Sequence, residues 1–205
     1  MTEVEFLQKV WDHQKKCKEL AEGDGGYNII RGQAKVSSGY IEDLFALFLA
    51  KRINRKDYRF LVDKTTSLRY SKNGKATTFK PDLSIINEEN IFTEYYDLKT
   101  NLGWNRDLEK YIKKKNEFVS KIKGRNGWIH FDKNNILDIK FSETLKYKMV
   151  VIHGGNINEI QLNKNLELVQ NLEHVELYIL YDHYNQRNNI EDFNRLYDLE
   201  SLNEQ

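Results

Sequence analysis

Two aspartates and a lysine in the first half of the chain have the residue types and the spacing of a hydrolytic site. Asp97 and Lys99 lie at the end of the apolar run IFTEYYDLKT, residues 91–100. This run has the composition of a strand, in which residues i and i+2 share a face, so the two side chains point the same way. An acid and a base on one face form either a surface ion pair, worth less than about 1 kcal/mol, or half of a catalytic site.

The single proline of the chain indicates where a second acid lies. Pro81 directly precedes Asp82, and a proline, which cannot donate to a sheet ladder, belongs at the start or the edge of a strand. We therefore expect a strand over 80–86, a turn at NEEN (87–90) and a returning strand over 91–99, paired as an antiparallel hairpin. Because Asp97 follows Asp82 by 15 residues, a short hairpin brings the two carboxylates and Lys99 to one point.

Two carboxylates at hydrogen-bonding distance repel each other, and a hard divalent cation such as Mg²⁺ relieves that repulsion. A neighbouring lysine can orient an attacking water or stabilise charge that develops on a phosphate. Such a set of residues would hydrolyse a phosphodiester. Glu42 is a candidate third acid, provided that its helix packs against the hairpin. Considered alone, an acid near the start of a helix more often favours the helix N-terminus.

Strand and helix patterns alternate along the rest of the chain. Helical patterns cover 2–22, 37–53 and 105–123, with weaker ones at 161–172 and 190–202. Strand patterns cover 57–63, 80–86, 91–99, 147–152 and 175–181, with a short strand or loop at 130–141. This order predicts an α/β fold with a mixed central β-sheet flanked by helices. We expect a single domain over 1–205, with a catalytic core at about 37–155 and with 2–22 and 182–205 peripheral or involved in dimerisation.

The two motifs resemble a known nuclease signature. Pro81-Asp82 followed by Asp97-Leu98-Lys99 looks like the PD-(D/E)XK motif, and within that superfamily residues 37–123 and 147–152 are most similar to type II restriction endonucleases of the EcoRV kind. Those enzymes have E-L-F, P-D-F and D-I-K-T segments. The corresponding places here are taken by Glu42-Asp43-Leu44-Phe45, Pro81-Asp82-Leu83 and Asp97-Leu98-Lys99-Thr100.

The resemblance implies a restriction-endonuclease-like core and a role for each residue of the motif. It implies Mg²⁺ ligands at Asp82, at Asp97 and at the backbone carbonyl of Leu98. It implies that Lys99 lies near the scissile phosphate and that Glu42 has an accessory catalytic role.

Charge is distributed unevenly, although the formal net charge is only +1. Residues 51–80 contain ten Lys and Arg against two Asp and Glu, and residues 105–125 contain eight against three. A concentrated basic face attracts phosphate, whereas a solvated lysine-rich surface would give the same counts.

Candidate DNA contacts lie in three segments. The segment SKNGKATT (71–78), which is otherwise an ordinary exposed turn around Asn73-Gly74, contributes several polar and basic side chains. The segment after the motif lies near the scissile phosphate by its place in the sequence. HGGNIN (153–158) is either a second DNA-reading loop or a plain turn. The residues are Lys72, Asn73, Lys75, Thr77 and Thr78; Thr100, Asn101 and Asn105; and Asn156 and Asn158.

These features together predict a Mg²⁺-dependent, sequence-specific endonuclease of double-stranded DNA, a type II restriction enzyme, which acts as a homodimer because a symmetric site is cut on both strands. A structure-specific nuclease, such as a junction resolvase or a repair nuclease, is the alternative within the same superfamily. A DNA-binding protein that does not cut, or a protein unrelated to nucleic acid, would belong to other classes.

Other chemistries have little support in the sequence. One cysteine permits no internal disulfide and no cysteine metal cluster, and no glycine-rich loop has the spacing that binds an organic cofactor. No apolar run approaches the roughly 18 residues of a membrane helix. The first residues, MTEVEFLQKV, lack a signal pattern, so we expect a cytoplasmic protein.

Overall fold

The computed structural model describes residues 1–21, 38–100, 108–131, 135–155 and 157–197. The chain forms two compact units, residues 1–54 and residues 55–205. The expectation of a single nuclease domain stays a prediction.

The first unit contains two helices, α1 (Glu3–Ala21) and α2 (Ser38–Ile53). Thr2 and Glu5 form a reciprocal cap at the start of α1, because the Glu5 N–H donates to Thr2 Oγ1 at 3.1 Å and the Thr2 N–H donates to Glu5 Oε2 at 2.8 Å. The ring of Phe6 in α1 stacks on Phe48 in α2 with a centroid distance of 4.8 Å. Both helices agree with the predicted ranges.

The second unit contains a mixed sheet and three helices of the described chain. Its strands are β1 (Arg59–Val62), β2 (Thr66–Leu68), β3 (Thr77–Phe79), β4 (Leu83–Ile86), β5 (Ile91–Lys99), β6 (Asn126–His130), β7 (Ile136–Phe141), β8 (Tyr147–His153), β9 (Val175–Asp182) and β10 (Arg187–Asn188). Its helices are α3 (Leu108–Ile122), α4 (Glu159–Gln170) and α5 (Ile190–Tyr197). The coarse prediction of an α/β fold with a mixed sheet flanked by helices is confirmed.

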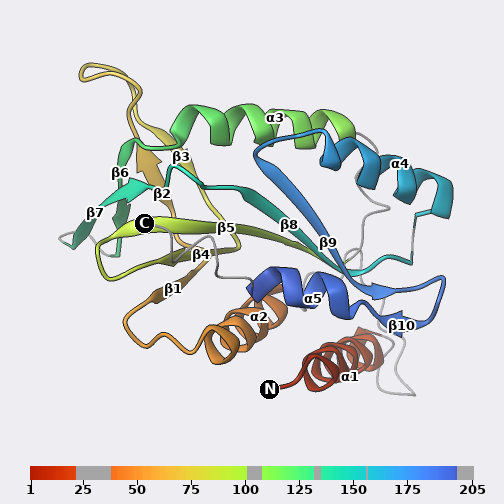
Figure 1. The fold of residues 1–205 in the computed structure, drawn as a ribbon. Coiled ribbons are helices and arrows are strands. Elements are labelled where there is room, and N and C mark those ends of the chain that lie inside the picture. The colour runs from red at the N-terminus through yellow and green to blue at the C-terminus, as the bar shows by residue number, and fades with distance from the viewer. Residues whose placement is uncertain (22–37, 101–107, 132–134, 156, 198–205) are drawn as a thin grey trace. The chain divides into compact units, whose positions relative to one another are not determined.

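The strand β5 is the centre of this sheet (Figure 1). It pairs antiparallel with β4 and parallel with both β7 and β8. Because Tyr95 and Tyr96 pair with β4 and also with β8, those two strands lie on opposite edges of β5. The sheet continues through β9 and β10 at one end, and through β7, β6, β2 and β3 at the other.

Helices α3 and α4 cover one face of the sheet, and α5 lies against the other face at β9 (Figure 1). The core under α3 and α4 is built from apolar side chains of both layers, such as Ile112 and Val119 of the helix and Met149 and Ile179 of the sheet. A parallel strand such as β8 is buried along nearly its whole length, which agrees with its continuous apolar sequence.

The β4–β5 hairpin is closed by a polar turn, as the sequence predicts. The side chain of Asn87 accepts hydrogen bonds from the backbone N–H groups of Glu89 and Ile91, and Asn90 adopts a φ of 63°, which asparagine tolerates better than most residues. The register shifts between Ile85 and Ile86, where Thr93 is the extra residue of β5. This bulge helps to decide which face of the sheet receives the side chains of the C-terminal half of β5.

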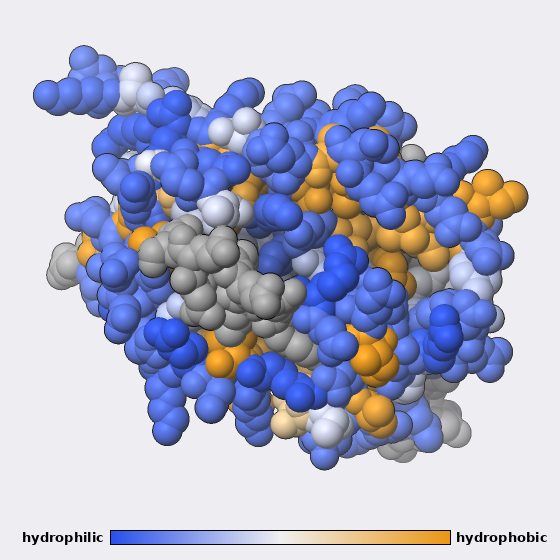
Figure 2. Space-filling model, viewed as in Figure 1, coloured by the Kyte–Doolittle hydropathy of each residue, from blue (hydrophilic) through white to orange (hydrophobic). Residues whose placement is uncertain are grey.

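The predicted turn at Asn73-Gly74 joins β2 to β3, which pair antiparallel. The turn projects from the end of the sheet, and its surface is mainly hydrophilic (Figures 1 and 2). The sequence predicts the turn but not the three-residue strands on either side of it.

The strand β6 was also missed, and Gly127 gives the physical reason. A glycine normally weakens a strand, but here a side chain at this position would lie 2.6 Å from the carbonyl oxygen of Ser67 and 2.8 Å from the ring of Phe141. The glycine therefore lets β2 and the Phe141 side chain approach β6 closely.

Among the described residues, no helix is both long and apolar enough to cross a membrane.

We expect Gly127→Ala to destabilise the protein by about 1–3 kcal/mol, because the added methyl group meets a backbone carbonyl that cannot easily move. Gly39→Ala is the control, since a Cβ at Gly39 in α2 meets nothing within 4 Å and alanine favours a helix by up to about 1 kcal/mol over glycine. Chemical denaturation measures both. Equal stability of the two variants would contradict this account of β6.

Candidate active site

The register of the β4–β5 hairpin places the two predicted acids opposite each other. Leu83 is the partner of Tyr96, so the next position along the hairpin sets Asp82 against Asp97. Lys99 Nζ lies 2.8 Å from Asp97 Oδ1 and 4.0 Å from Asp82 Oδ2. The structure therefore brings Asp82, Asp97 and Lys99 together at the open end of the hairpin.

Backbone groups hold this end of the hairpin in place. The Leu98 N–H donates to Asp82 Oδ2 at 2.6 Å, and the Leu98 carbonyl accepts from Lys99 Nζ at 3.2 Å. The Asp63 N–H donates to the Asp82 carbonyl at 3.1 Å, which ties the end of β1 to the start of β4. Pro81 is buried directly before Asp82, at the strand start where its missing N–H costs nothing.

Two tyrosines that the sequence analysis did not identify complete the surroundings of Asp97. The hydroxyls of Tyr111 and Tyr147 each donate to Asp97 Oδ2 at 2.5 Å. Tyr111 comes from α3, and Tyr147 is the first residue of β8, where it pairs with Tyr95. No local motif marks either tyrosine, because the contacts span 14 and 50 residues of sequence.

The two acids have opposite electrostatic environments. Burial, the hydrogen bond with Asp97 and the charge of Asp97 together raise the pKa of Asp82 to about 7, although Lys99 partly opposes the shift. Burial also disfavours charge on Asp97, but the hydrogen bond with Asp82, the Lys99 ammonium and the Tyr111 hydroxyl outweigh it and hold the pKa of Asp97 below its ordinary range. Below about pH 7 the coupled pair therefore holds one proton, which belongs mainly to Asp82.

The donor set suits a small hard cation. Two carboxylates with a neighbouring backbone carbonyl are oxygen ligands of the kind that Mg²⁺ takes, and Mg²⁺ usually needs only one or two carboxylates. Burial and the charge of Asp97 both disfavour the ionised form of Asp82, and a bound cation would favour that form. Within the described residues no cluster of three or more His, Cys, Asp and Glu side chains could hold a metal, so the fit rests on these two acids and the Leu98 carbonyl.

The predicted third acid, Glu42, lies in α2 and so belongs to the first unit. Its role as an accessory catalytic residue stays a prediction.

The predicted DNA contacts lie in several places. Lys72, Asn73 and Lys75 are exposed in the β2–β3 turn, and Thr77 and Thr78 belong to β3. These five residues precede Pro81 and lie on an accessible projecting hairpin.

The remaining predicted contacts follow the motif or β8. Thr100 is exposed directly after β5, and its carbonyl accepts from the His153 N–H at 3.0 Å. Asn158 caps α4 by accepting from the Gln161 N–H at 2.8 Å, which gives its side chain a structural role. Asn101, Asn105 and Asn156 lie outside the described residues.

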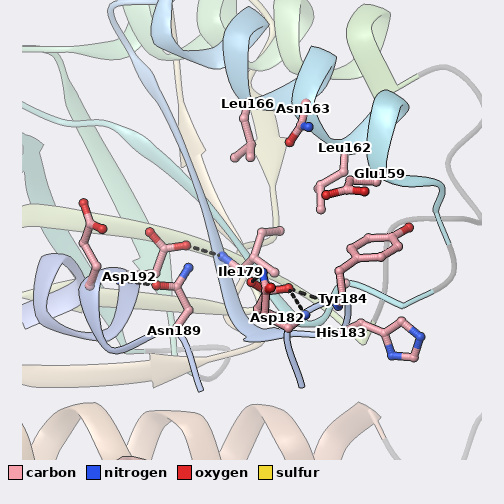
Figure 3. A pocket seen from close by; sticks show the side chains of 13 residues that line it. Glu159, Leu162, Asn163, Leu166, Ile179, Asp182, His183, Tyr184, Asn189 and Asp192 are labelled. Carbon is pink, nitrogen blue, oxygen red and sulfur yellow. Dashed lines mark hydrogen bonds between the residues drawn. The ribbon is translucent and has the colours of Figure 1, made fainter. Parts of the chain in front are cut away.

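A separate polar cavity of about 260 Å³ lies between α4, the end of β9 and α5 (Figure 3). Two of the acids that line it already have partners. Asp182 accepts from the Tyr184 N–H and from Asn185, and Asp192 accepts from the Ile179 N–H at 2.7 Å. These hydrogen bonds give Asp182 and Asp192 a structural role, because they hold the turn after β9 and join α5 to β9.

Comparison of the chain with protein-family models, with curated proteins and with solved structures found no match.

We expect Asp82→Asn to stabilise the metal-free protein at pH 8. Because the pKa of Asp82 is about 7 in the folded protein and 3.8 ordinarily, the folded state holds a proton that the unfolded chain has already lost, and stability falls as pH rises through that window. The asparagine removes this cost and keeps an acceptor for the Leu98 N–H. Thermal unfolding in EDTA should show a gain at pH 8 that shrinks towards pH 4.

Asp97→Asn is the matched comparison and should have the opposite sign. The amide replaces an ionised carboxylate that meets three donors, so we expect a loss of about 1–3 kcal/mol from pH 5 to pH 8. If both variants lost stability equally at pH 8, the proposed division of charge between the two acids would be wrong.

Proposed function

We propose that the protein is a Mg²⁺-dependent endonuclease of double-stranded DNA, of the PD-(D/E)XK type, and that it acts as a sequence-specific restriction enzyme. The observation that carries the proposal is the position of Lys99, whose ammonium lies within 4.0 Å of two acids that converge from β4 and β5. An ordinary surface ion pair needs only one acid. Here two acids face each other, and the pKa of one of them, Asp82, is raised.

The proposed metal ligands are Asp82, Asp97 and the Leu98 carbonyl. When bound, Mg²⁺ would polarise a phosphate oxygen and lower the pKa of a water molecule. The protein holds the two acids on opposite strands, so their spacing is set by backbone pairing and not by flexible loops.

Lys99 has two functions in this proposal. Its side chain is 34% exposed, so it can leave Asp97 Oδ1 and donate to a phosphate oxygen or to the attacking water. A bond then forms between the water oxygen and phosphorus while the bond from phosphorus to O3′ breaks. The attacking water loses one proton to the surrounding solvent, and the leaving O3′ takes up one proton from it, giving the 3′-hydroxyl and 5′-phosphate that the family resemblance implies.

The arrangement of the elements supports a restriction-endonuclease-like core. The antiparallel β4–β5 pair carries the motif, α3 follows it in the chain, and β8 lies parallel to β5 on the other edge. A two-fold homodimer would provide two such sites for the two strands of a symmetric DNA sequence.

The projecting β2–β3 hairpin supports DNA as the substrate. Between residues 64 and 80 the chain has five Lys and Arg and no Asp or Glu, and most of these side chains are exposed. We expect Lys72→Ala with Lys75→Ala to weaken duplex binding and to reduce the salt slope by about 1–2, because each phosphate contact contributes about 0.9. Lys164→Ala, an exposed lysine of α4, is the control and should leave the slope unchanged. If the wild type and both variants had the same salt slope, the hairpin would not be part of the DNA interface.

The activity itself is tested with duplex DNA of phage size, in Mg²⁺ and in EDTA. We expect discrete bands only with Mg²⁺, and we expect Lys99→Ala to lower the rate by about 10²–10³-fold because it removes a charged donor at the developing charge. Lys140→Ala is a matched control, since Asp138-Ile139-Lys140 repeats the D-x-K spacing on β7. It should cleave at the wild-type rate.

Other outcomes would identify the alternatives. Cleavage restricted to branched junctions would indicate a structure-specific nuclease. Tight, salt-dependent duplex binding without any cleavage would indicate a DNA-binding protein that does not cut. Weak binding that does not respond to salt would contradict a nucleic-acid function.

A further inference from the structure

The D-x-K motif accounts for only one oxygen of Asp97. Oδ1 accepts from Lys99, whereas Oδ2 accepts from Tyr111 and Tyr147, each at 2.5 Å. Tyr147 is fully buried and Asp97 is nearly so, while Tyr111 is half-buried. The two phenols come from different elements, α3 and β8, and their oxygens lie 3.3 Å apart. Two donors on one oxygen, fixed from two directions, define the orientation of the carboxylate.

A lysine lies against the same two tyrosines. Lys115 Nζ donates to the hydroxyl of Tyr95 at 2.5 Å. It also lies over three rings, 4.9 Å from the centroid of Tyr95, 5.3 Å from that of Tyr111 and 4.7 Å from that of Tyr147. A cation over an aromatic face is attracted to the ring by up to about 2 kcal/mol when it is partly desolvated. Lys115 therefore ties the two phenol donors to each other and to β5.

We propose that Tyr111 and Tyr147, held by Lys115, are positioning residues that orient Asp97 as a metal ligand. This inference rests on the proposed function and adds to it the groups that orient the Asp97 carboxylate. With Oδ2 fixed by two hydroxyls, Oδ1 is the oxygen left for a cation, since its partner Lys99 has a flexible and partly exposed side chain that can move aside. Hydrogen bonds to a ligating carboxylate typically change metal affinity by about 10–100-fold when they are lost.

The competing explanation is purely structural. Buried phenols need acceptors and a buried carboxylate needs donors, so the cluster could do no more than satisfy its own members. Metal affinity separates the two explanations. A structural cluster would alter stability and leave the metal affinity unchanged, whereas a positioning cluster must alter the affinity of the folded protein for the cation.

The test measures binding of Mn²⁺, as a paramagnetic substitute for Mg²⁺, to the DNA-free protein by electron paramagnetic resonance. The variants are Tyr111→Phe, Tyr147→Phe and the double variant. We expect the dissociation constant of the double variant to rise by about 10–100-fold, with a smaller rise for each single variant. Lys115→Met replaces the ammonium group with an uncharged, apolar side chain. It should raise the dissociation constant by less than the double variant does.

Tyr178→Phe is the control for loss of a buried phenol. Tyr178 is as buried as Tyr147 and donates its hydroxyl to Glu176, a carboxylate that takes no part in the proposed site. It should lower the thermal midpoint without changing the Mn²⁺ affinity. Tyr111 is only half-buried, so Tyr111→Phe tests the inference even if the Tyr147 variants fold poorly.

The outcomes separate this inference from the proposed function. If the wild type binds Mn²⁺ and the Asp82→Asn variant does not, the metal site exists. Tyrosine variants that then bind Mn²⁺ like the wild type would overturn the positioning role alone. If the wild type binds Mn²⁺ no better than Asp82→Asn, the proposed metal-dependent function fails, and the inference fails with it.

Discussion

The pairing of β4 with β5 is the constraint on which the site depends. Its register sets Asp82 opposite Asp97 at the open end of the hairpin, and like charges directly opposite each other destabilise a sheet. The structure accommodates the repulsion with specific donors, namely the Leu98 N–H on Asp82 and Lys99 with two tyrosine hydroxyls on Asp97. The neighbouring strands β1 and β8 hold both edges of the hairpin, so the acids cannot separate without disrupting the centre of the sheet.

The donors are divided unequally, and that inequality distinguishes the two acids. Asp97 meets three side-chain donors and remains ionised, whereas Asp82 meets one backbone donor and has a pKa raised to about 7. Neighbouring titratable groups whose environments separate their pKa values are typical of functional sites, although structural ion pairs can also shift them.

The sequence predicted the local parts of this site and could not predict the distant ones. Strand alternation placed Asp97 and Lys99 on one face, and a short turn after Pro81 placed Asp82 beside them, because both inferences need only a hairpin. Tyr111 and Tyr147 contact Asp97 from a helix and from a parallel strand. These contacts depend on tertiary packing, which a short sequence motif cannot predict. The same limit explains why β6 was not predicted. In the sequence, Gly127 indicates an interruption of a strand, but in the sheet it permits close packing. For Asn158, a residue type that can read DNA bases also caps a helix, and the structure shows the cap.

The balance of charge around Asp97 connects the site to its proposed substrate. Two carboxylates face two ammonium groups, since Lys99 contacts Asp97 directly and Lys115 lies on the tyrosines behind it. With both acids ionised, the four side chains have no net charge, so a divalent cation would leave an excess of two positive charges in a partly buried site. A phosphodiester brings one negative charge and additional oxygen ligands, which would offset part of that excess. Metal and DNA should therefore strengthen each other's binding, because coupling between two ligands is reciprocal. A weak affinity for the metal alone would then be consistent with a site that binds the metal and the phosphate together.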